Sequence, residues 1–180
     1  MFLSLPILEI LQIPGIIEKA LEEAGISTQD GYSYSPLDIL MTLLLGFLLK
    51  CQKFDEIHTI LGEHDNYGVW IGKKRLPSID VIKRRLQKFA TPDLVKALKR
   101  LLAQSIAKAG IVDLGVVYLD SHFITYYGKH NISKGYSTIR RLALRGIYHH
   151  FIGDRRGRPI MFYLTNGAIR LRRTLPMLLK

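Results

Sequence analysis

The residue types change abruptly at Gly110, and this change limits the folds that the chain can adopt. Before this glycine the sequence is rich in Leu, Lys and Ala, with apolar positions at helical spacing. After it, Val, Ile, Tyr and Phe dominate, and these residues fit the pleated surface of a strand. The sequence therefore predicts an α+β protein, with an all-α region over residues 1–110, a β-rich region over 111–180 and a boundary near 110–114.

Amphipathic helices are expected throughout the first region. Pro14-Gly15 divides the pattern of residues 5–24 into two short helices, and Ser35-Pro36 supplies an N-cap followed by proline at the first helical position. The later helices are expected over residues 36–51, 54–62, 77–89 and 92–109. The apolar run at 39–49 is too short to span a bilayer, so it predicts a buried helix and no membrane contact.

The helix expected at 77–89 has a basic face. Its apolar positions, among them Ile82 and Phe89, point inward, and its cations are expected to point largely outward; they are Lys83, Arg84, Arg85 and Lys88. Several short helices followed by a basic amphipathic helix resemble a helix-turn-helix domain that reads DNA in the major groove. The alternative is a solvated basic face on an ordinary helical bundle, and the pattern fits both equally.

Positive charge is concentrated in the β-rich region. The chain has a formal net charge of +11, and residues 111–180 hold 12 of its 26 Lys and Arg but only three of its 15 Asp and Glu. Nine of these cations are Arg, which makes bidentate contacts with phosphate. An anionic partner that bears phosphate is therefore expected, either nucleic acid or an acidic membrane surface, and a basic surface that serves only solubility is the alternative. The candidate contacts to the DNA backbone are Arg140, Arg141, Arg145, Arg155, Arg156 and Arg158.

Cysteine usage and the N-terminus bear on the compartment. Cys51 is the only cysteine, so it can form neither an intramolecular disulfide nor a zinc site by itself, and a reducing setting is the simplest interpretation. The first residues, Met-Phe-Leu-Ser-Leu-Pro, lack the positive leader of a secretion signal. Together with a DNA partner, these features predict a cytoplasmic, nucleoid-associated protein.

Three strands are expected in the β-rich region. They cover residues 115–127, 141–153 and 159–165. A polar loop is expected at 129–134, a hairpin turn at 154–157 and a new helix from Leu171. Asp120 lies near the middle of the first strand, where a carboxylate is costly to bury unless hydrogen bonds, a cation or a metal satisfies it. Asp120 is therefore the main candidate for a functional residue.

The β-rich region resembles the beginning of the catalytic core of the DDE transposases of bacterial insertion sequences. The resemblance rests on Val116-Val-Tyr-Leu-Asp-Ser-His122 for the first acidic strand. For the next two strands it rests on residues 145–160, Arg-Gly-Ile-Tyr-His-His-Phe-Ile-Gly-Asp-Arg-Arg-Gly-Arg-Pro-Ile. Upstream, residues 76–86 look like the helical region that precedes the core. The resemblance spans about 75–180 and implies the first three antiparallel strands of an incomplete RNase H-like domain.

The resemblance also implies an activity, DNA transposition, in which the protein binds insertion-sequence ends and catalyses DNA cleavage and strand transfer. In that family a first-strand Asp, a second Asp on a later strand and a Glu on a following helix bind two Mg²⁺ or Mn²⁺ ions. The ions activate the attacking hydroxyl and stabilise the leaving oxygen. Asp120 matches the first position, so it is the candidate catalytic and metal-binding residue. No other small-molecule cofactor is implied.

The other two carboxylates of this pattern are missing. After Asp120 the only acidic residue is Asp154, which fits the hairpin turn better than a metal site, and no Glu follows Glu63. We therefore expect the N-terminal part of a longer transposase, inactive alone and unable to bind Mg²⁺ tightly. Its incomplete sheet is expected to leave an edge and an apolar face open, through which the chain would self-associate.

Two other functions fit the same sequence. A non-catalytic DNA-binding regulator would use the β-rich region for packing or dimerisation, and an RNase H-like nuclease fragment would belong to a protein that cleaves without strand transfer. His122 lies two residues after Asp120, on the same face of a regular strand, and is a weaker candidate for a metal or phosphate contact. His149 and His150 are adjacent and must face opposite sides of their strand, so they do not suit a shared metal.

Overall fold

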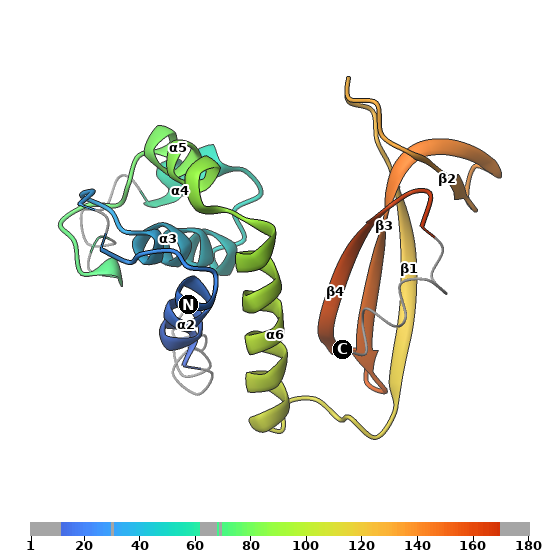
Figure 1. The fold of residues 1–180 in the computed structure, drawn as a ribbon, viewed down its shortest axis with the longest axis horizontal. Coiled ribbons are helices and arrows are strands. Elements are labelled where there is room, and N and C mark those ends of the chain that lie inside the picture. Colours follow the sequence, from blue (N-terminus) through green and yellow to red (C-terminus); the bar gives the residue numbers. More distant parts are fainter. Residues whose placement is uncertain (1–11, 30, 62–67, 69, 170–180) are drawn as a thin grey trace. The chain divides into compact units, whose positions relative to one another are not determined.

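The computed structural model describes residues 12–29, 31–61, 68 and 70–169. The chain divides into two compact units, Met1–Leu102 and Ala103–Lys180. Helices form the first unit and an antiparallel sheet dominates the second (Figure 1), which confirms the expected α+β class. The border between the units falls inside the last helix, earlier than the change in residue types at 110–114.

The described helices agree closely with the expected ones. They are α2 (Ile13–Glu23), α3 (Pro36–Leu48), α4 (Phe54–Leu61), α5 (Ile79–Phe89) and α6 (Pro92–Lys108). Ser35 caps α3 reciprocally with Asp38, because the Ser35 hydroxyl accepts from the backbone N–H of Asp38 and the Asp38 carboxylate accepts from the backbone N–H of Ser35. Pro14 lies in the first turn of α2. The short helix expected before it, and the helix expected from Leu171, lie outside the described residues.

The core of the helical unit forms around α3, which packs against α2, α4 and α5. Five large apolar side chains are at most 2% exposed: Leu21, Ile39, Leu45, Ile82 and Leu94. Within the described residues, no helix has the length and apolar character needed to cross a membrane. One face of the apolar run of α3, with Ile39, Met41 and Leu45, lies in the core, whereas Phe47 is 78% exposed.

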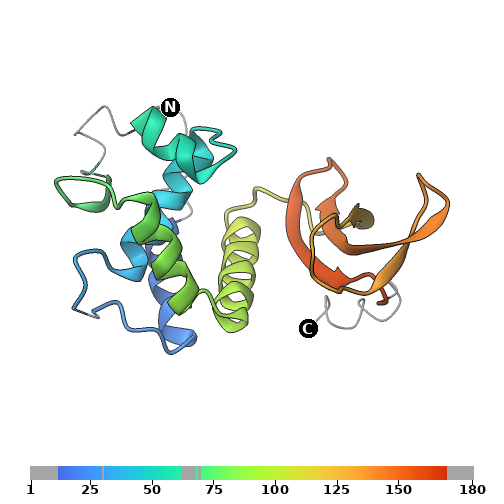
Figure 2. The ribbon, with the colours of Figure 1, turned by 90° about the horizontal axis from the view of Figure 1, so that it is seen from above.

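The sheet unit is organised around its longest strand. The described strands are β1 (Val117–Thr125), β2 (Lys134–Ser137), β3 (Leu142–Asp154) and β4 (Pro159–Asn166). β3 is central, with β1 along one edge and with β2 and β4 paired to successive parts of the other edge, all antiparallel. Seen from above, the strands curve strongly (Figure 2). Three of these strands match the expected ones.

Strand β2 was not expected, because its sequence, Lys-Gly-Tyr-Ser, is short, polar and contains a glycine. It forms because Lys134 pairs with Arg145 and Ser137 with Leu142 in a hairpin at the start of β3. The pairing partner, and not the local residue pattern, makes this segment a strand.

Strands β2, β3 and β4 meet closely at Gly146, where the contact positions are occupied by glycine: Gly135, Gly146 and Gly167. The N–H of Gly146 donates to the carbonyl of Ser133, and its carbonyl accepts from the N–H of Gly167, so β2 and β4 meet at this residue. A Cβ atom at Gly146 would overlap the Phe123 ring and the carbonyl oxygen of Ile124. The lack of a side chain is therefore a packing requirement at this position.

We expect Gly146→Ala to lower the free energy of unfolding by about 1–3 kcal/mol, because the added methyl group overpacks the contact with Phe123. Urea denaturation followed by circular dichroism measures the loss. Gly15→Ala is the control, since a Cβ there meets nothing within 4 Å and alanine favours the helix. Equal stability of the Gly146 variant and the unmodified chain would contradict this packing.

Candidate nucleic-acid interface

Asp120 lies on β1 as expected, but its side chain is exposed to solvent. Its neighbour across the sheet is Phe151 of β3. The Asp120 carboxylate accepts a 2.7 Å hydrogen bond from the backbone N–H of Ser121 through Oδ1. The carboxylate is therefore hydrated and supported by its own backbone, so it does not need the buried partner that the sequence suggested.

The histidines are arranged as the strand pattern predicts. His122 pairs with His149 across β1 and β3, on the face that carries Asp120, whereas His150 lies on the opposite face. In the part of the chain that the structure describes, no group of three His, Cys, Asp or Glu side chains could hold a metal ion. These residues do not fit a two-metal centre, which needs three carboxylates, so no metal-dependent step follows from them alone.

Within the sheet unit, the face around Asp120 exposes several apolar side chains. The large apolar side chains on it that are more than a third exposed are Tyr118, Ile124, Phe151, Phe162 and Leu164. Phe151 and Phe162 are cross-strand partners, and their ring centroids lie 6.4 Å apart. These exposed fractions agree with the expected uncovered apolar face of the sheet. Self-association through it stays a prediction.

A hydrogen-bonded chain of side chains crosses the opposite face. His150 is 1% exposed, and its Nδ1 lies 2.7 Å from the Ser121 hydroxyl while its Nε2 lies 2.8 Å from the Thr165 hydroxyl. Burial, with a smaller contribution from the charge of His149, lowers the pKa of His150. The imidazole thus links β1, β3 and β4 through hydrogen bonds. It lies beside a hollow of about 440 Å³. Sequence reasoning missed this chain because its members lie on three different strands.

Asp154 closes the β3–β4 hairpin, as the sequence predicts. It is 1% exposed and accepts hydrogen bonds from the backbone N–H groups of Asp113, Arg156 and Arg158 and from the Arg158 side chain. Burial on its own would raise the pKa of Asp154. The hydrogen bonds from Arg158, Asp113 and Arg156 outweigh burial and hold this pKa well below its usual range. Asp154 is therefore a structural anion.

The six arginines proposed to contact DNA fall into two groups at opposite ends of β3. At the hairpin end, Arg155 pairs with Asp113 at 2.7 Å and Arg158 pairs with Asp154 at 2.5 Å, while the Arg156 side chain is exposed. At the β2 end lie Arg140, Arg141 and Arg145, all exposed. The structure therefore does not gather the six into one cluster, and two of them already form ion pairs with carboxylates of the sheet unit.

The basic face of α5 differs from the expected one at Arg85. Lys83, Arg84 and Lys88 are exposed, but Arg85 is only 4% exposed, so the interpretation that it points outward is wrong. The Arg85 guanidinium stacks 4.2 Å from the ring centre of Tyr32. Helical spacing places Arg85 on the same inward face as Ile82 and Phe89. The Tyr32 ring stabilises the buried guanidinium by stacking on it.

The spacing of the helices also differs from that of a helix-turn-helix pair. The described residues 70–78, which precede α5 and are not α-helical, are already more numerous than the turn of about three or four residues that joins the helices of the motif. Lys88 donates a 2.8 Å hydrogen bond to the Tyr32 hydroxyl, so it too is partly engaged within the unit. Lys83 and Arg84 remain the α5 cations best placed for a phosphate contact.

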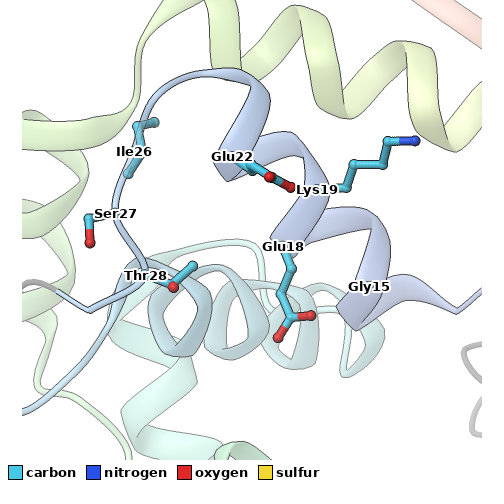
Figure 3. Close-up of a pocket in the computed structure, with 7 residues that line it drawn as sticks. All are labelled: Gly15, Glu18, Lys19, Glu22, Ile26, Ser27 and Thr28. Atoms are coloured by element: carbon cyan, nitrogen blue, oxygen red, sulfur yellow. The ribbon is translucent and has the colours of Figure 1, made fainter.

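A hollow of about 630 Å³ beside α2 is less suited to DNA. Figure 3 shows Glu18, Glu22 and Lys19 around it, with Ser27 and Thr28 on the following loop. Two carboxylates and one ammonium group give this hollow a net negative lining, which repels phosphate. The candidate interface therefore lies on α5 and on the sheet unit.

Comparisons with protein-family models, with curated proteins and with solved structures found no match to this chain.

Sequence reasoning also missed two exposed tyrosines, Tyr32 and Tyr127. Tyr32 is 54% exposed and lies against the α5 cations, and Tyr127 is 76% exposed just after β1. The pair Tyr126-Tyr127 gave a signal, because adjacent residues at the end of a strand point to opposite sides and one of the two rings tends to face solvent.

Proposed function

We propose that this chain is part of a DDE-type DNA transposase and contributes its DNA-binding region and the first strands of an RNase H-like domain. The strand order carries the proposal. Asp120 lies near the middle of β1, β3 pairs antiparallel with β1, and β4 pairs antiparallel with β3 after a tight hairpin. This order is the one with which an RNase H-like fold begins, and its first strand bears the acidic residue.

In this proposal Asp120 is the first carboxylate of a metal centre. Its exposed position supports the role, because a ligand for Mg²⁺ or Mn²⁺ at a phosphodiester must be reachable by both the ion and the DNA. The remaining acidic ligands would have to come from outside the residues described here. The bound ions would supply the chemistry of phosphodiester cleavage and joining.

The choice of DNA as partner rests on charge. The chain carries a net charge of +11, and the described cations Lys83, Arg84, Arg140, Arg141 and Arg145 are exposed on their units. Arginine and lysine at such positions contact phosphates without reading sequence. The protein would then reside on chromosomal DNA in the cytoplasm.

The 180-residue chain is expected to bind duplex DNA without cutting it. Binding, measured by fluorescence anisotropy, should weaken at least about tenfold between 50 and 200 mM salt, because each phosphate contact releases counterions. Incubation of supercoiled plasmid with the chain and Mg²⁺ should give no nicked product above that of Asp120→Ala. Nicking that the Asp120 variant loses would overturn the expected inactivity, and binding that ignores salt would contradict a phosphate interface.

A non-catalytic DNA-binding protein is the second candidate. It is favoured by one observation: among the described residues, no other carboxylate shares the Asp120 face of the sheet. The two candidates differ in the coding sequence that follows codon 180. A continuation that encodes a strand with an Asp and a helix with a Glu supports the transposase, whereas salt-dependent DNA binding without any such continuation supports the regulator.

A further inference from the structure

Tyr127 presents its ring to solvent although the fold does not require it to. The neighbouring Tyr126 holds the loop after β1, because its hydroxyl accepts a 3.3 Å hydrogen bond from the backbone N–H of His130 and its ring covers Gly128. Tyr127 is instead 76% exposed. The exposed ring is therefore available to an outside partner.

One arginine lies beside this ring, and two others lie nearby in the β2–β3 hairpin. The guanidinium carbon of Arg140 lies 5.9 Å from the ring centre of Tyr127. Arg145 lies on β3, and its backbone carbonyl accepts a 2.9 Å hydrogen bond from the N–H of Tyr126. Arg141 follows Arg140 at the start of β3. We call Tyr127, Arg140, Arg141 and Arg145 the Tyr127 patch.

The cations of the Tyr127 patch are not neutralised within the described residues. Arg140, Arg141 and Arg145 form no ion pair with a described carboxylate, whereas Arg155 and Arg158 at the other end of β3 both do. Three positive charges in one hairpin, one of them beside an exposed aromatic ring, give a surface that fits a ligand with both phosphates and a flat face.

Arg141 occupies a strained position in the β2–β3 turn. Its φ angle is 53°, a left-handed conformation in which glycine or asparagine is normally found. The β2–β3 turn would form more easily with glycine at this position.

We propose that the Tyr127 patch binds single-stranded DNA, with an unpaired base stacked on Tyr127 and with the three arginines on the flanking phosphates. In a duplex the faces of the bases are covered by their neighbours, so a protruding ring gains little. In a single strand, stacking on an aromatic side chain strengthens binding by roughly 5- to 150-fold per base. The inference rests on the proposed function only for the choice of DNA.

The test compares a fluorescently labelled 20-nucleotide strand with its duplex, using anisotropy and the full chain. Tyr127→Ala should weaken single-strand binding at least about fivefold and duplex binding less than about twofold, and Tyr127→Phe should restore single-strand binding because stacking needs only the ring. Tyr118→Ala is the matched control, since Tyr118 is 60% exposed at the opposite end of the sheet. It should change neither affinity.

Arg141→Gly separates binding from folding. It removes one cation and relieves the left-handed backbone, so single-strand affinity should fall while the melting temperature stays the same or rises. If Tyr127→Ala weakens both DNA forms equally or neither, or if RNA of the same sequence binds more tightly, this inference fails while the proposed DNA-binding function stands. If neither DNA form binds at all, both fail together.

Discussion

Replacement of Asp154 by asparagine is expected to raise the unfolded population of the sheet unit at least about tenfold. Asp154 accepts three backbone N–H groups and the side chain of Arg158 while almost fully buried. An amide in its place turns an NH₂ group toward some of these donors and removes the charge that Arg158 neutralises. Thermal unfolding followed by circular dichroism measures the effect.

Arg156→Ala in the same hairpin is the control, because the Arg156 side chain is exposed and only its backbone N–H bonds to Asp154. This variant should unfold at nearly the temperature of the unmodified chain. If Asp154→Asn also did so, the hydrogen bonds around Asp154 would contribute little, and the hairpin would depend on strand pairing alone.

The same carboxylate predicts how stability depends on pH. The hydrogen bonds lower the pKa of Asp154 in the folded state below its ordinary value of 3.8. Because the folded state holds the proton less tightly than the unfolded state, the stabilisation is complete above pH 3.8 and is lost progressively as the pH falls below it. The Asp154→Asn variant lacks this dependence, so melting curves of the two proteins should converge as the pH falls below that value.

Features with a local cause could be predicted from the sequence. Ser35 caps α3 because its hydroxyl and the Asp38 carboxylate lie three residues apart. The β3–β4 hairpin forms where Asp154 and Gly157 supply the turn, and Gly157 adopts a φ of 75° as such a turn requires. Asp120 was placed on a strand because branched and aromatic residues flank it on both sides. Each of these signals lies within a few residues of the feature that it determines.

Features that depend on distant partners could not be predicted in this way. Lys134 to Ser137 form a strand only because β3 extends far enough to pair with them. Arg85 is buried because Tyr32, far away in the chain, offers a ring for its guanidinium. An ion pair likewise engages one of the proposed DNA contacts in the hairpin. Arg155 pairs with Asp113, which precedes β1. Residue type sets what a side chain is able to do, and tertiary contacts decide whether it is free to do it.

Arg85→Ala is expected to lower the free energy of unfolding of the helical unit by about 2 kcal/mol, with little direct effect on DNA affinity. The substitution removes a buried side chain and its stacking 4.2 Å from the ring centre of Tyr32. The double substitution of Lys83 and Arg84 by alanine should lower the affinity for DNA and have little effect on the free energy of unfolding. These exposed side chains contribute little to stability, but each lost phosphate contact lowers duplex affinity about tenfold at 0.1 M salt.

Urea denaturation and fluorescence anisotropy on the same preparations separate the two roles. A double-mutant cycle with Tyr32→Ala tests the stacking itself, because the loss from Arg85→Ala should shrink once the Tyr32 ring is absent. If Arg85→Ala weakened DNA binding without loss of stability, Arg85 would reach the DNA and the basic face of α5 would be wider than its exposed residues. If the Lys83 and Arg84 variant bound duplex DNA with full affinity, α5 would be a solvated face, and the sheet unit would provide the DNA contacts.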